Sequence, residues 1–262
     1  MKTSEDIVNE SGYPLQIYLE NLVKEQDKDK DFIWRFQQSE HRWIDEHSKE
    51  EGFIDLVLKN KRGNYRIIIE CKRITGKWNF IVQEQAQEIT YDSKILRVDY
   101  QTLNYSWPNF HLKPASYEAA YCVMETEGKR DTRSLEKISG ELLLSLEYLA
   151  IDETEFLVKT FPEKNPLLDN EICYVPLIVT TADLQLFTFN PKDFDIKTGK
   201  IIKSSGESVQ YIRFKKNLSS HIKFENLGKN YDYSKENKEF DRTVFIVHAE
   251  YLIEFLKSFG SF

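Results

Sequence analysis

The sequence is poor in the residues that mark several protein classes. Its 262 residues include only 3 cysteines, 10 glycines and 7 prolines. Three widely separated cysteines, Cys71, Cys122 and Cys173, exclude a disulfide framework and a cysteine-rich zinc site, so we expect reduced core thiols. The scarcity of glycine and proline excludes collagen-like and low-complexity chains. With 40% hydrophobic and 30% charged residues, the chain should form a packed core.

Long apolar runs are also missing. The aliphatic stretch Leu142 to Leu144 is far shorter than a bilayer span, and the polar start Met1 to Glu5 lacks the apolar region of a signal peptide. We therefore expect a cytoplasmic protein without a membrane partner. At this length, one large domain is favoured over two independent ones.

An excess of basic residues is absent, because 36 lysines and arginines face 43 aspartates and glutamates, for a net charge of −7. The overall charge therefore gives no attraction for nucleic acid, and any phosphate-binding surface must be local. One stretch is locally basic, with Glu70 as the only acidic residue among its cations: Lys59, Lys61, Arg62, Arg66, Lys72, Arg73 and Lys77.

The clearest local pattern lies in the first 75 residues. Pro14 suits a first helical position, and apolar residues at three- and four-residue spacing predict a helix over residues 14–25. A charged connection precedes strand-like residues 32–44. Two apolar runs, residues 53–58 and 65–71, flank a polar turn and predict a β-hairpin.

The rest of the chain alternates between the two types of element, which predicts a mixed α/β fold. Residues 77–111 show no stable period, and we interpret residues 76–116 as an insertion. The further predicted elements are a strand at 119–124, a helix over 132–150 that includes Gly140, strands at 174–181, 184–189 and 243–247, and a final helix carrying Leu252, Phe255, Leu256 and Phe259.

The hairpin places ionisable residues close together. Antiparallel pairing puts Asp55 opposite Ile69 or Glu70, and alternation sends Glu70 and Lys72 to one face, about 7 Å apart. Two carboxylates on adjacent strands repel each other unless a cation or proton lies between them. Mg²⁺ takes such oxygen ligands, and a neighbouring lysine can orient or help deprotonate a water. The pattern therefore favours metal-assisted phosphodiester hydrolysis.

At these residues the sequence resembles the PD-(D/E)XK nuclease superfamily, which has the restriction-endonuclease-like fold. The match consists of Asp55 after Gly52-Phe53-Ile54, then Glu70-Cys71-Lys72 at a strand end, and a preceding helix that carries Glu20. The resemblance implies that Asp55, Glu70 and the main-chain carbonyl of Cys71 bind the metal. It also implies that Lys72 assists the water and that Glu20 joins the catalytic site.

The resemblance implies a core of helix, three-stranded meander, helix and strand. These elements map onto residues 14–25, 32–73, 132–150 and 174–181. We accordingly expect a single nuclease-like domain over residues 1–262, with a core at 12–75 and 117–190, the insertion at 76–116 and a C-terminal α/β extension at 191–262. The alternative is that the core helix lies within the insertion, around Ile81 to Tyr91.

Glu-x-Lys alone is a weak signal, and the chain contains two further copies, at residues 127–129 and 236–238. Only Glu70-Cys71-Lys72 combines an apolar strand, a paired aspartate and a preceding helix. The competing interpretation of the same residues is a surface ion network between the two strands.

The expected function is therefore that of a Mg²⁺-dependent deoxyribonuclease in which Mn²⁺ can substitute. The family resemblance suggests an endonuclease of restriction or anti-phage defence. Arg73 and Lys77 are candidates for phosphate contacts, a partner protein could supply affinity for DNA, and cutting of both strands would suit a homodimer. The alternatives are a catalytically silent nucleic-acid-binding or scaffolding subunit with the same fold, or action on RNA or on a DNA junction.

Overall fold

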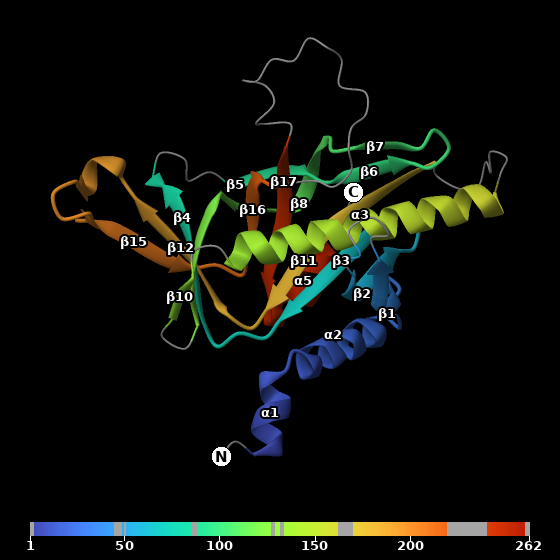
Figure 1. The fold of residues 1–262 in the computed structure, drawn as a ribbon, viewed down its shortest axis with the longest axis horizontal. Coiled ribbons are helices and arrows are strands. Elements are labelled where there is room, and N and C mark those ends of the chain that lie inside the picture. The colour runs from blue at the N-terminus through green and yellow to red at the C-terminus, as the bar shows by residue number, and fades with distance from the viewer. Residues whose placement is uncertain are drawn as a thin grey trace, which may run out of the picture.

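The computed structural model describes residues 3–44, 49, 51–84, 89–126, 129–131, 134–161, 170–218 and 240–259. These residues form a mixed α/β protein, as the sequence predicts, built around a ten-stranded sheet and a five-stranded sheet (Figure 1). The order in the large sheet is β1-β2-β3-β11-β17-β16-β8-β5, with β6 pairing to β11 and β7; the order in the smaller sheet is β10-β9-β4-β12-β15.

The predicted N-terminal elements are confirmed. Helix α2 (Tyr13–Gln26) buries Leu15, Leu19 and Val23, and it follows a short helix α1 (Ser4–Glu10). Strands β1 (Trp34–Ile44), β2 (Glu51–Asn60) and β3 (Tyr65–Lys72) form an antiparallel meander. Gly63, at φ +80°, closes the β2–β3 turn in a conformation that favours glycine.

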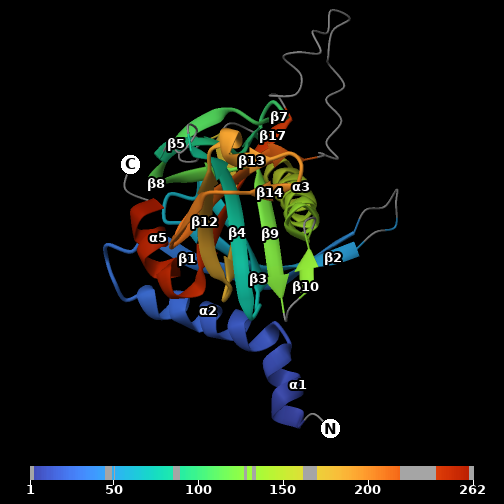
Figure 2. The same cartoon turned by 90° about the vertical axis from the view of Figure 1, so that its left-hand side faces the viewer.

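A long helix connects this meander to a parallel strand. Helix α3 (Ser134–Thr160) precedes β11 (Glu171–Thr180), which pairs in parallel with β3 and with β17 (Asp241–His248). The sheet is buried on both faces, which explains the nearly continuous apolar sequence of β11. Helix α2 and the last helix α5 (Leu252–Phe259) cover one face, and α3 lies over the other (Figure 2).

The predicted end of the long helix at residue 150 is wrong, because α3 continues to Thr160. Its last turns lack a strong apolar stripe and are held by polar contacts. Glu153 accepts hydrogen bonds from the Arg66 Nε at 3.0 Å and from the Tyr174 hydroxyl at 2.8 Å. Hydrophobic periodicity does not reveal such polar contacts, so the helix predicted from it ends before α3 does.

The stretch between the meander and α3 contains strands. Its strands and their bounds are β4 (Gly76–Gln83), β5 (Ile89–Lys94), β6 (Leu96–Asp99), β7 (Asn104–Ser106), β8 (Asn109–Ala119), β9 (Tyr121–Thr126) and β10 (Lys129–Asp131). The alternative core helix around residues 81–91 is therefore wrong where the structure describes this segment, since β4 and β5 occupy its ends and residues 85–88 lie outside the description. The strand expected at 119–124 is divided between the end of β8 and β9.

The remaining predicted elements are confirmed near their expected positions. Strand β12 (Asp183–Phe189) lies beside β4 in the smaller sheet, and β17 and α5 end the described chain. After β12, the strands that the sequence did not indicate are β13 (Phe194–Asp195), β14 (Lys200–Ile201), β15 (Ser204–Ser208) and β16 (Tyr211–Asn217). Among the described residues, no helix is long and apolar enough to cross a membrane.

Gly140 gives a direct test of local helix energetics. It lies inside α3, and a Cβ added there would meet no atom within 4 Å, so no close approach requires glycine. Gly140→Ala should therefore stabilise the protein by up to about 1 kcal/mol. Thermal unfolding should show a rise in Tm of roughly 2–4 °C.

Gly199 is the matched control for this substitution. It also has open space around it, but its φ is +66°, in the left-handed region. Gly199→Ala should lower Tm, because a Cβ is strained in that conformation. Equal shifts for both variants would show that backbone conformation does not decide the outcome.

Candidate functional site

The candidate site lies where β2 and β3 separate. Their ladder ends at the pair Leu56–Ile69, so the next positions are Asp55 and Glu70, the second of the two predicted pairings. Beyond that pair, the Asp55 Oδ2 accepts a hydrogen bond from the main-chain N–H of Cys71 at 2.6 Å. A side-chain carboxylate thus replaces a main-chain partner at the end of the ladder.

The two faces of β3 are divided as the alternation predicts. Ile67, Ile69 and Cys71 pack in the core under α2 and α5, whereas Ile68 packs in the core on the side of α3. On that second side, the Lys72 Nζ lies 2.5 Å from the Glu70 Oε1. The predicted common face of Glu70 and Lys72 is therefore confirmed. The ion pair itself is also a feature of the competing interpretation as a surface network.

The main-chain carbonyl of Cys71 faces the Asp55 side. In a strand, the N–H and C=O of one residue point toward the same neighbouring strand. The Cys71 N–H is directed at Asp55, while the next carbonyl, that of Lys72, accepts from Thr181 N on the β11 side. The predicted oxygen donors Asp55, Glu70 and the Cys71 carbonyl therefore lie together where the β2–β3 ladder ends, and this end of the ladder is called the edge here.

Burial and neighbouring charges shift the pKa values of three side chains at this edge. Burial, followed by repulsion from Glu70, raises the pKa of Asp55 to about 7, against the Cys71 N–H and Lys72, which lower it. Burial alone would lower the pKa of Lys72, but the Glu70 and Asp55 carboxylates raise it above its usual value. Lys72 is therefore an ammonium group at neutral pH. Burial and the adjacent carboxylates also raise the pKa of the Cys71 thiol, which stays protonated.

The helix residue that reaches Asp55 is Gln16, which the sequence pattern did not indicate. The Gln16 side chain is buried, and its Nε2 donates to the Asp55 carbonyl at 3.2 Å and to the Glu40 carboxylate at 2.5 Å. Glu40 lies in β1 between the pairs Ser39–Leu56 and His41–Ile54, with φ +52°, and its charge contributes to the raised pKa of Asp55. The sequence feature that could have indicated Gln16 is its spacing, because it lies one helical turn before Glu20, the helix residue predicted for the site.

The other predicted residues lie farther from this contact. Glu20 forms an ion pair with Lys24, one turn later in α2. Arg73 is half-buried just beyond β3, and Lys77 is exposed on β4, where its ladder partners are Glu125 and Asp183. Two neighbouring acidic residues weaken the positive potential at Lys77. The two other Glu-x-Lys motifs fall largely outside the described residues.

The donor set fits a hard divalent cation better than zinc. In the described part of the chain, no three His, Cys, Asp or Glu side chains converge to hold a metal. The edge instead offers two carboxylates and a main-chain carbonyl, and Mg²⁺ combines one or two carboxylates with water and phosphate oxygens. Burial, and after it repulsion from Glu70, raise the pKa of Asp55, and a bound cation would relieve that repulsion.

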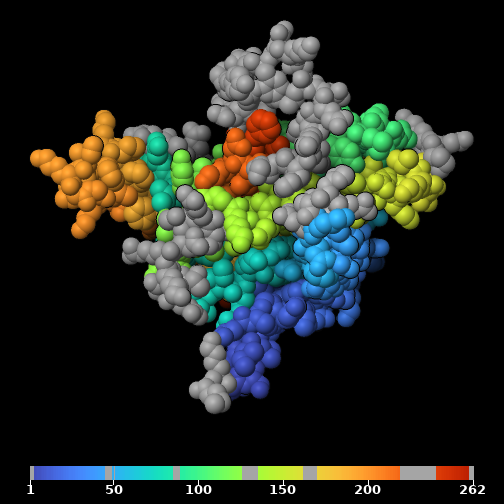
Figure 3. Space-filling model, in the orientation of Figure 1, coloured from blue at the N-terminus to red at the C-terminus, as the bar shows by residue number. Residues whose placement is uncertain are grey.

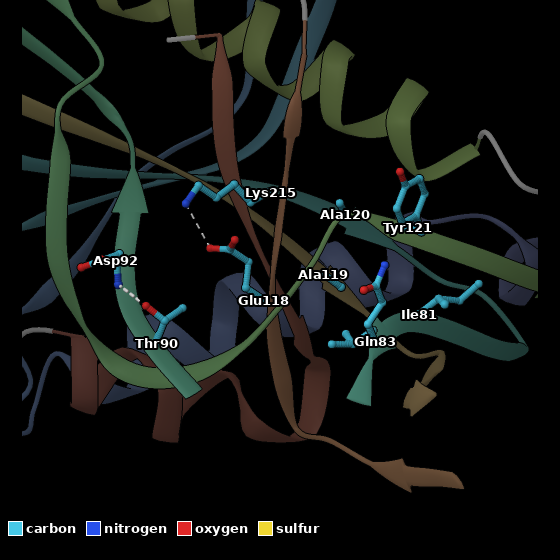
Figure 4. A pocket seen from close by; sticks show the side chains of 10 residues that line it. Ile81, Gln83, Thr90, Asp92, Glu118, Ala119, Ala120, Tyr121 and Lys215 are labelled. Carbon is cyan, nitrogen blue, oxygen red and sulfur yellow. Dashed lines mark hydrogen bonds and ion pairs between the residues drawn. The ribbon is translucent and has the colours of Figure 1, made fainter. Parts of the chain in front are cut away.

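A separate cavity of about 500 Å³ lies between the two sheets. Figure 4 shows the Lys215 side chain directed at Glu118, with Gln83 and Tyr121 on the opposite side of the view. The charges at this cavity have partners within the protein, because Lys215 pairs with Glu118 at 3.2 Å and Asp92 with His111 at 2.9 Å. None of the predicted site residues lines it.

In comparisons with known proteins, no family model, no curated protein and no solved structure matches this chain.

Proposed function

We propose that this protein is a Mg²⁺-dependent nuclease of the PD-(D/E)XK type that hydrolyses DNA phosphodiester bonds. The single observation that supports it best is that Asp55, Glu70, Lys72 and the Cys71 carbonyl lie together where strands β2 and β3 separate. The order of helix α2, meander β1–β3, helix α3 and parallel strand β11 agrees with the core that the family resemblance implies.

Each residue at this edge has a role in the proposal. Asp55, Glu70 and the Cys71 carbonyl would hold the cation, which would polarise the phosphate and increase the acidity of a bound water. Lys72, held by Glu70 as an ammonium group, orients the attacking water and stabilises charge that develops on the phosphate. Gln16 fixes the main chain of Asp55 from the other face of the sheet.

The direct test is cleavage of supercoiled plasmid and of single-stranded DNA with Mg²⁺, with Mn²⁺ and with a chelator. We expect cutting with either metal and none with chelator. Cutting that persists in Asp55→Ala would indicate another active site or a contaminating nuclease. An endonuclease nicks the circular plasmid, so this substrate also separates the proposal from an exonuclease. RNA and junction substrates in the same series distinguish the remaining alternatives.

The contacts of α2 give a further prediction. Gln16→Leu removes both hydrogen bonds at Asp55 and Glu40 and should lower the cleavage rate by about 10- to 100-fold, as the loss of a residue that supports a metal ligand does. Glu20→Gln should have a smaller effect, because Glu20 pairs with Lys24 on the helix surface. Initial rates with Mg²⁺ decide this. A larger loss in Glu20→Gln would favour the family's helix glutamate as the site residue.

A further inference from the structure

A projecting segment between β12 and β15 has no role in the candidate site. This segment, residues 190–204, is called the arm here; it contains a 3₁₀ turn (Pro191–Asp193) and the hairpin strands β13 and β14. In Figure 3 the orange part of the chain that includes β15 forms a lobe at the edge of the molecule, and Figure 2 shows β13 and β14 from that side.

The arm is held in one conformation by its own hydrogen bonds. Gly199 N donates to the Asp195 carbonyl and Ile202 N to the Asp193 carbonyl, each at 2.8 Å. The Asp195 carboxylate accepts from Lys197 N at 2.9 Å and from the Thr198 hydroxyl at 2.7 Å. A partner would therefore meet a preformed surface, with little ordering required on binding.

The arm is positively charged although the chain has a net charge of −7. It contains four lysines, Lys192, Lys197, Lys200 and Lys203, against Asp193 and Asp195. All four lysines are exposed, and none forms an ion pair with any described residue. Since Asp195 is engaged by the turn, the lysines are the groups available to an external anion.

The arm also presents bare aliphatic side chains. Ile196 is 88% exposed and Ile202 76% exposed, and these are the highest values for large hydrophobic residues in the described chain. Exposed aliphatic side chains on a preformed, basic hairpin are typical of proteins that insert an apolar wedge into the minor groove of DNA while lysines bind phosphates.

We propose that the arm binds double-stranded DNA, with its lysines on the phosphates and Ile196 and Ile202 against the minor groove. This inference rests on the proposed nuclease function. Strand β12 links the two regions, because it begins two residues after Thr181, which donates a hydrogen bond to the Lys72 carbonyl, and the arm begins after Phe189. Seven strand residues span about 20 Å, so one duplex of about six base pairs reaches from the start of β12 to the arm.

The test is binding of a fluorescent 30-base-pair duplex, measured by anisotropy with chelator present and at several salt concentrations. Changing all four arm lysines to glutamine should weaken binding at least about tenfold and reduce the slope of log K against log salt by about 3 to 4. Ile196→Ser combined with Ile202→Ser should weaken binding and leave that slope unchanged, because no charge is lost.

The matched control changes four exposed lysines elsewhere, Lys28, Lys30, Lys113 and Lys159, to glutamine, which alters the net charge equally. The proposal predicts a change of less than about twofold in that control. It is overturned if wild type does not bind the duplex, if both lysine variants lose affinity equally, or if the arm binds vesicles of anionic phospholipid in preference to DNA.

The experiment also separates this inference from the proposed function. Binding in chelator needs no cleavage, so arm-dependent binding by a protein that cuts nothing would support the arm and contradict the nuclease. Hydrolysis of a small phosphodiester, bis(p-nitrophenyl) phosphate, needs no arm contact and should be equal in wild type and both arm variants. Loss of that hydrolysis in the arm variants would place the arm in the active site and overturn the inference.

Discussion

Lys72→Ala should lower the initial rate of Mg²⁺-dependent plasmid nicking by about 100- to 1,000-fold, the effect of removing one preorganised electrostatic group from an active site. The physical reason is position and charge. The Lys72 Nζ lies 2.5 Å from Glu70, and the two carboxylates raise its pKa, so the ammonium group is fixed next to the proposed metal ligands. Alanine removes the charge and leaves Glu70 unpaired.

Two further variants make this result specific. Lys77→Ala removes an exposed lysine five residues later, between Glu125 and Asp183, and should change the rate only slightly. Lys72→Arg keeps the charge and should recover part of the loss. Circular dichroism and Tm of each variant show whether the fold is retained. Equal rates for wild type and a folded Lys72→Ala would contradict the assignment of Lys72.

An inactive wild type would instead favour the second function considered from the sequence, a catalytically silent subunit. The net charge of −7 and the acidic neighbours of Lys77 are consistent with that alternative. In that case the ion pair of Glu70 and Lys72 is a structural contact, and Glu70→Ala should lower stability with no change in DNA binding.

The hairpin could be predicted from the sequence because the residues that determine it are close together in the chain. A two-residue period divides β3 into Ile67, Ile69 and Cys71 on one face and Glu70 and Lys72 on the other, and a short polar turn sets the pairing to within one residue. The helix over residues 14–25 follows from the same kind of pattern.

The contacts that complete the site are not local. Gln16 meets Glu40 and Asp55 across 24 and 39 residues, and no spacing rule connects them. The end of α3 depends on Arg66 and Tyr174, which come from two different strands. The arm was missed because its strands contain two residues each and are held by turn hydrogen bonds rather than by an apolar period.

Asp55→Asn should stabilise the metal-free protein at pH 8 by roughly 2 to 4 kcal/mol and have little effect at pH 3.5. Burial and Glu70 raise the pKa of Asp55 from 3.8 to about 7. Between these values the folded state binds more protons than the unfolded state. The contribution of protonated Asp55 to stability is thus complete below pH 3.8 and is lost as the pH rises through 7. Asparagine avoids this loss and can still accept the hydrogen bond from Cys71 N.

Urea unfolding of wild type and Asp55→Asn across pH 3.5 to 8 measures the effect. Asp99→Asn is the control, because the pKa of Asp99 is shifted in the opposite direction. Burial would raise the pKa of Asp99, but hydrogen bonds from Thr102 and Gln101 lower it, so this variant should gain no stability at pH 8. Adding Mg²⁺ at pH 8 should then raise the Tm of wild type and leave Asp55→Asn and Glu70→Ala almost unchanged, because only wild type has both carboxylates whose repulsion a cation relieves. Parallel pH profiles of the free energy of unfolding for wild type and Asp55→Asn would mean that ionisation of Asp55 does not destabilise the folded state. The electrostatic argument for a cation at this edge would then fail.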